Sequence, residues 1–104
     1  SAKKKMEEEV QDTQMTPEQI KRMNPFKAYI YKFCTIYGCT IQDICKVTGF
    51  QNANFRKGMN TRRITLNSYF RLCEGLCKLS KQYNEDYYLV RIKHALLQKD
   101  LRNE

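Results

Sequence analysis

Residues 40–55 constrain the fold more than any other part of the chain. Thr40 is a suitable helix cap, and apolar or small residues follow it at helical spacing. Gly49 interrupts this pattern, because glycine readily takes the positive φ of a tight turn. Phe55 is the one large apolar residue beyond the turn and is expected to anchor a second helix. The segment therefore predicts two helices joined by a three-residue turn, over about 41–48 and 52–57.

The rest of the chain also shows helical periodicity. Apolar residues recur at spacings of three and four, and neither a strand pattern nor an internal repeat is visible. The predicted fold class is therefore all-α, a five-helix domain with an extra short N-terminal helix. Besides the two helices above, helices are predicted over about 17–23, from Pro25 to Gly38, from Thr65 or Leu66 to about Lys81, and after Asn84.

Three regions are expected along the chain. Residues 1–14 are polar, and their charges occur in runs of three lysines and then three glutamates. We therefore expect a mobile charged arm. Residues 15–83 contain the paired helices and form the main domain. Residues 84–104 are expected to form a C-terminal helix that either closes the core or makes a homodimer. The candidate dimer surface is its apolar stripe of Leu89, Ile92 and Leu96.

The charge of the chain is segregated. The 104 residues carry a formal net charge of +8, and residues 25–83 hold ten basic and two acidic side chains. A polyanion is the natural partner of such a segment, since each neutralised phosphate releases counterions. The alternative is a solvated basic face. No apolar run approaches the roughly 20 residues that span a bilayer, so we expect no membrane association and a cytoplasmic location.

The five cysteines and single histidine form no metal-binding signature. The number of cysteines is odd, no CxxC pair occurs, and His94 is distant in sequence. The cysteines are therefore expected to be small buried residues, and no metal or cofactor is expected. No nucleophile–base pair, paired carboxylates or phosphate-binding loop is visible. We therefore predict no catalytic residue and no enzyme activity.

The sequence pattern of residues 26–76 is similar to that of a known family. The segment resembles the Cro/lambda-repressor-like helix-turn-helix family, in which a glycine and a cap precede the first helix of the pair. A small residue lies at the helix crossing, and a glycine and an apolar residue form the turn. The matching positions are Gly38, Cys39, Thr40, Cys45, Gly49, Phe50, Phe55, Leu66, Tyr69, Phe70, Leu72, Cys73, Gly75 and Leu76.

Three positions depart from the family pattern. Ile41 stands where the family commonly has a glutamine that grips phosphate. Gln51 replaces the usual Ser or Thr cap of the second helix and is a poorer cap. Gly58 replaces an apolar residue, so we expect the second helix to stop at Lys57 and Met59 to fill the vacated space.

The resemblance implies a set of DNA contacts. Asn52, Ala53 and Lys57 match the positions that contact bases in the major groove, and Arg56 can reach either a base or a phosphate. Asn pairs with adenine, Lys donates to guanine, and Ala touches the thymine methyl. The expected contacts to the DNA backbone are Thr40 through its N–H, together with Gln51, Asn54, Asn60, Thr61, Arg62 and Arg63.

The expected function is sequence-specific binding of double-stranded DNA by a small transcriptional regulator, a repressor from a bacterium or mobile element. The alternative is an antitoxin-like or accessory module on the same fold, whose main partner is another protein. The departures at Ile41 and Gly58 motivate this alternative.

Overall fold

A computed structural model describes residues 15–98, all of whose regular elements are helices. The expected mobile arm, residues 1–14, and the last six residues lie outside this part. The helices are α2 (Pro17–Lys21), α3 (Pro25–Tyr37), α4 (Ile41–Thr48), α5 (Asn52–Thr61), α6 (Leu66–Ser80) and α7 (Glu85–Leu97).

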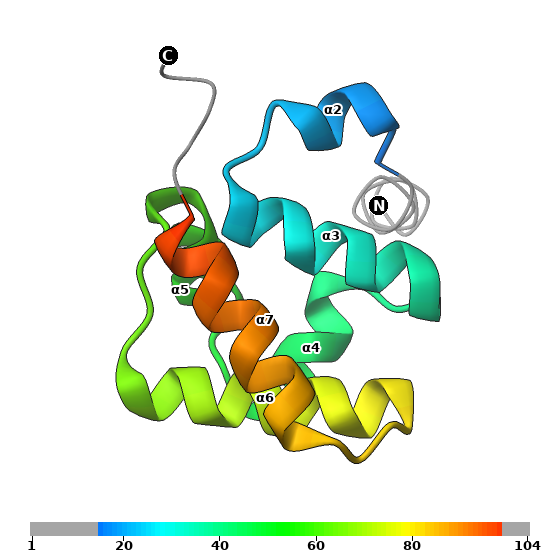
Figure 1. Cartoon of the computed structure of the whole chain (residues 1–104), viewed down its shortest axis with the longest axis vertical. Coiled ribbons are helices and arrows are strands. Elements are labelled where there is room, and N and C mark those ends of the chain that lie inside the picture. The colour runs from blue at the N-terminus through cyan, green and yellow to red at the C-terminus, as the bar shows by residue number, and fades with distance from the viewer. Residues whose placement is uncertain (1–14, 99–104) are drawn as a thin grey trace, which may run out of the picture.

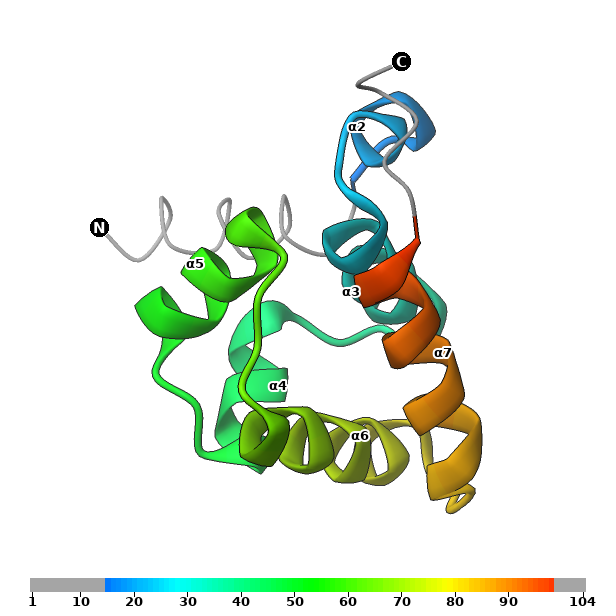
Figure 2. The same ribbon diagram turned by 60° about the vertical axis from the view of Figure 1, so that its left-hand side comes forward.

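The helices are arranged around α6 and α3. α6 packs against both α4 and α7, and α7 also packs against α3 (Figure 1). α2 packs on α3 at the outside of the molecule. Figure 2 shows α4 and α5 on one side and α2, α3 and α7 on the other. This separation gives the molecule two different helical surfaces.

One apolar core joins the helices from α3 to α7. Phe26, Ile30, Ile44, Leu76 and Ile92 are fully buried in it. The expectation of buried cysteines is confirmed, since all five thiols lie in this core. Burial raises the pKa of the Cys73 thiol to about 12, because the thiolate would lose its hydration.

Local capping signals are confirmed at the helix starts. The side chains of Thr16 and Thr40 accept hydrogen bonds from the third residue of their helices, and Gln19 and Asp43 complete both capping boxes. The caps at Asn24, Thr65 and Asn84 are formed as well. α2 ends at Lys21, two residues before the expected end.

The expected end of the second paired helix is wrong. α5 continues through Gly58 to Thr61, and the expectation that Met59 is buried is confirmed at 1% exposure. A Cβ atom on Gly58 would lie 2.8 Å from the carbonyl oxygen of Arg63. The Arg63 N–H in turn donates to the Gly58 carbonyl at 2.9 Å. Gly58 therefore permits the chain to fold back closely after α5, and it does not terminate the helix.

The apolar residues of α6 and α7 are buried to different extents. Leu66 and Phe70 are 70% and 46% exposed, so the first turns of α6 extend beyond the core. On α7, Ile92 is fully buried, and Leu89 and Leu96 pack against the core. This packing agrees with the core-closing alternative for the C-terminal helix.

Candidate nucleic-acid interface

The turn between α4 and α5 is held by local contacts. Gly49 has φ of 80°, in the left-handed region. The buried Thr48 hydroxyl donates to the Ile44 carbonyl at 2.7 Å and accepts from the Phe50 N–H at 3.3 Å. The Phe50 ring stacks on Phe55, with centroids 5.3 Å apart. These contacts fix the direction in which α5 leaves α4.

α5 divides into a buried face and an outer polar face. Phe55 and Met59 face the core, whereas Ala53 and Lys57 are exposed. Asn52 is half-buried, and its Oδ1 accepts a hydrogen bond of 2.6 Å from Arg56 Nε. The structure therefore brings together the four residues expected to contact bases on the first turns of one helix.

The second half of α5 is attached to the start of α3. Asn24, buried at the α3 cap, donates through Nδ2 to the Met59 carbonyl at 2.7 Å. Lys27 Nζ donates to Asn60 Oδ1 at 2.8 Å. The sequence did not reveal Lys27 as a neighbour of α5, because Lys27 and Asn60 lie 33 positions apart.

Besides Asn60, which accepts from Lys27, three residues expected at the DNA backbone have other partners. The Thr40 N–H donates to Asp43 Oδ2 at 2.9 Å. Arg62 donates through Nε and Nη2 to the Ala95 carbonyl at 3.2 and 3.0 Å. The Thr61 hydroxyl donates to the Lys57 carbonyl at 2.8 Å. The Thr40 N–H, the Thr61 hydroxyl and the Arg62 guanidinium are therefore engaged within the protein and are not assigned to phosphates.

Polar residues gather instead around a pocket of about 370 Å³ between α5, the turn and the start of α6. Gln51, Asn54 and Arg63 are exposed residues that line it. Arg71, which the sequence reasoning missed, lines it from α6, with its guanidinium 5.8 Å from the centre of the Phe50 ring. A Cβ on Gly49 would lie 2.8 Å from Arg71 Nη2, so glycine also makes room for this cation.

The electrostatic character of this side is positive. Residues 44–73 contain six basic side chains and no acidic one. Ile41, for which the sequence predicts no phosphate contact, is fully buried. Burial raises the pKa of the Cys45 thiol, and the nearby Arg56 charge opposes this effect. An anionic ligand therefore meets attraction along α5 and the loop that follows it.

We also searched residues 15–98 for metal-ion sites and membrane spans. Groups of three His, Cys, Asp or Glu side chains placed to hold a metal ion are absent from this part of the chain. None of its helices combines the length and the apolar character needed to cross a bilayer. Comparison with family models, with curated proteins and with solved structures found no match to this chain.

Proposed function

We propose that the protein binds double-stranded DNA sequence-specifically, with α5 lying in the major groove. The observation that carries the proposal is the outer face of α5, which is polar and accessible and belongs to a segment, residues 44–73, with six basic side chains and no acidic one. α5 also follows α4 across a turn held by buried contacts, so the face is presented on a fixed support. A Cro/lambda-repressor-like arrangement of the helices belongs to the same proposal.

The base contacts are assigned to the start of α5. Lys57 is exposed and donates to guanine O6 or N7, and Ala53 contacts a thymine methyl. The Asn52 Oδ1 that accepts from Arg56 keeps a second lone pair, and its amide N–H groups point to an adenine edge in the proposed complex. Arg56 thereby orients Asn52 and adds positive charge beside the groove.

The phosphate contacts are assigned to the pocket beside α5. Arg63 and Arg71 supply the charge, and Gln51 and Asn54 supply amide donors. Asn60 and Lys27 form a second polar pair at the other end of α5. Contacts of this kind set affinity and register, whereas the start of α5 sets sequence preference.

Occupation of an operator by such a domain blocks other proteins from the same DNA, which is the basis of the proposed repressor function. The test is selection of binding sites from a random duplex library, followed by affinity measurement at several salt concentrations. The proposal predicts one enriched motif and an affinity that falls steeply with salt. Binding that enriches no motif contradicts sequence-specific recognition.

A further inference from the structure

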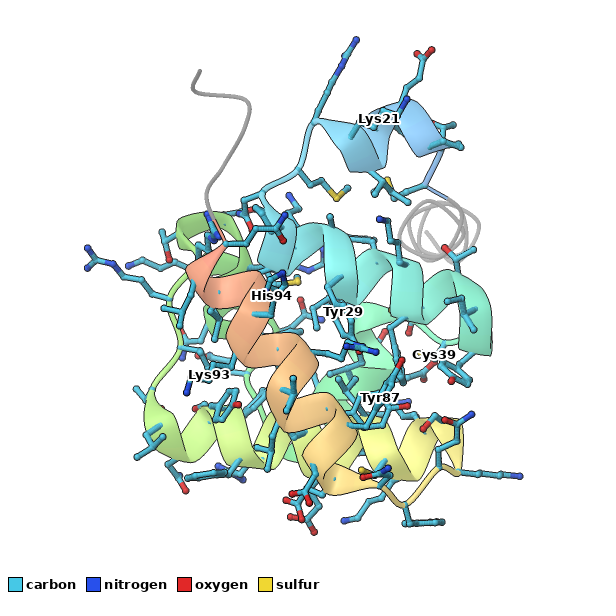
Figure 3. All side chains as sticks on the ribbon, in the orientation of Figure 1. Lys21, Tyr29, Cys39, Tyr87, Lys93 and His94 are labelled. Carbon is cyan, nitrogen blue, oxygen red and sulfur yellow. The ribbon has the colours of Figure 1, made fainter. Side chains whose placement is uncertain are left out.

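A second surface lies between α2, α3 and α7. These helices enclose a groove of about 870 Å³. Its apolar lining includes Ile20, Met23, Ala28, Tyr29, Ile36 and Ala95. Lys21, Tyr29 and His94, labelled in Figure 3, come from the three helices that form it.

The apolar lining is partly open to solvent. Ile36 is 71% exposed, and Ile20, Met23, Ala28 and Tyr29 are half-buried. Burial raises the pKa of the Tyr29 hydroxyl, which shows that this ring is partly withdrawn from water. A continuous apolar recess of this kind is typical of a surface that receives apolar side chains of a partner.

The charged residues around this recess are all basic. Lys21, Lys32 and Arg91 are exposed, as is His94, and no acidic side chain in residues 15–98 lines the groove. The Arg91 guanidinium lies over the Tyr87 ring, 4.6 Å from its centre, which holds this cation at the edge. A ligand that fits both features has apolar side chains on one face and carboxylates on the flanks.

We propose that this groove binds an acidic amphipathic helix of a partner protein. Apolar residues one turn apart enter the recess, and flanking Asp or Glu residues meet Lys21, Lys32 and Arg91. DNA is a poorer occupant, because its outer surface offers phosphates and no aliphatic side chains. A second copy of the same groove is also poorer, since a two-fold contact would oppose two sets of cations.

The groove is separate from the proposed DNA surface. α2, α3 and α7 lie on one side of Figure 2, whereas the outer face of α5 lies on the other. One lining residue, Ala95, carries the carbonyl that accepts the two hydrogen bonds from Arg62 at the end of α5. Binding of a partner helix in the groove therefore does not depend on DNA binding.

The test is selection of the full chain against a displayed library of random 16-residue peptides. The affinities of enriched peptides are then measured by fluorescence anisotropy. We expect enriched sequences with Asp or Glu and apolar residues at spacings of three and four. The double variant Lys32→Glu/Arg91→Glu is expected to weaken these peptides by about tenfold or more.

Lys93→Glu is the control for a charge reversal on α7, because Lys93 is on the same helix as Arg91 but does not line the groove (Figure 3). This control is expected to keep affinity within about twofold, and circular dichroism confirms that each variant is folded. Ile36→Glu supplies a second test, because this exposed residue can change without loss of the core. Enrichment of basic or uncharged peptides overturns the proposal, as does equal binding by the groove variants and the control. A concentration-dependent dimer that Ile36→Glu dissociates assigns the groove to a second copy and also overturns it.

Discussion

Arg62 and Ala95 connect the end of α5 to the end of α7. The Arg62 Nε and Nη2 atoms both donate to the Ala95 carbonyl oxygen, at 3.2 and 3.0 Å. Arg62 is also the C-cap of α5, with φ of 59°. A charged group thereby satisfies a carbonyl in the last turn of α7. Its neighbour Arg63 faces the pocket beside α5, so two adjacent arginines have different roles.

Substitution of Arg62 is expected to lower stability. Arg62→Lys keeps the charge but loses the paired hydrogen bonds, which should reduce the free energy of unfolding by about 1–2 kcal/mol. Arg63→Lys is the matched control and should leave stability within about 0.5 kcal/mol, because Arg63 is exposed. Chemical denaturation of both variants measures the difference. Equal stabilities would contradict the assigned role of Arg62.

Gly58→Ala is expected to destabilise the protein although alanine is the better helix former. The added Cβ would meet the Arg63 carbonyl oxygen at 2.8 Å, and that oxygen belongs to the backbone. We expect a loss of about 1–3 kcal/mol, where propensity alone predicts a gain of about 1 kcal/mol. Thermal unfolding distinguishes the two signs. A variant more stable than the parent would show that the return of the chain after α5 is not closely packed.

Phe55→Ala is expected to disrupt the paired helices. Phe55 is buried and stacks on Phe50, so its removal should cost about 3–5 kcal/mol. Phe70→Ala removes the same side chain from a position that is 46% exposed and serves as the control. The control should lose about 1 kcal/mol or less. Similar losses in the two variants, measured by urea unfolding, would show that Phe55 does not anchor α5.

Alkaline pH is expected to weaken the fold through buried thiols. The pKa of Cys73 rises from 9.0 to about 12 because of burial. The folded chain therefore keeps a proton that the unfolded chain releases, and stability falls as the pH rises above about 9. The loss reaches at most about 1.4 kcal/mol per pH unit for this thiol.

Unfolding under reducing conditions between about pH 8 and 11 measures this loss. Burial also raises the pKa values of Cys77 and Tyr88, so several groups contribute in the same direction. Cys73→Ala should flatten the decline without removing it. A Cys73→Ala profile parallel to that of the parent would show that Cys73 makes no contribution.

Most helix starts could be predicted from the sequence, because every described helix except α5 begins at a cap whose side chain accepts from a residue three positions later. The caps at Thr16 and Thr40 are both of this local kind. The end of α5 could not be predicted in the same way. In the sequence, Gly58 has the character of a helix breaker. Only the folded chain shows that the Arg63 carbonyl oxygen lies 2.8 Å from the position that a Cβ on residue 58 would take.

The roles of the other residues depended on contacts distant in sequence. In the sequence, Arg62 has the features of a phosphate contact. In the structure, its guanidinium donates to the carbonyl of Ala95, which lies 33 residues later. The apolar residues around Ile92 have the same spacing whether they cover a core or a partner. In the structure, α7 packs against α3 and α6, and Ile92 lies in the core. Arg71 joins the pocket beside α5 because α6 returns across the turn.

Recognition of DNA by the outer face of α5 is tested by the affinity of variants for the selected duplex. Lys57→Ala and Asn52→Ala should each cost about 1–3 kcal/mol and relax preference at one base pair. Lys78→Ala, on the exposed face of α6, is the control and should change affinity little. We expect this contrast at every salt concentration. Equal affinities for the three variants and the parent would contradict it.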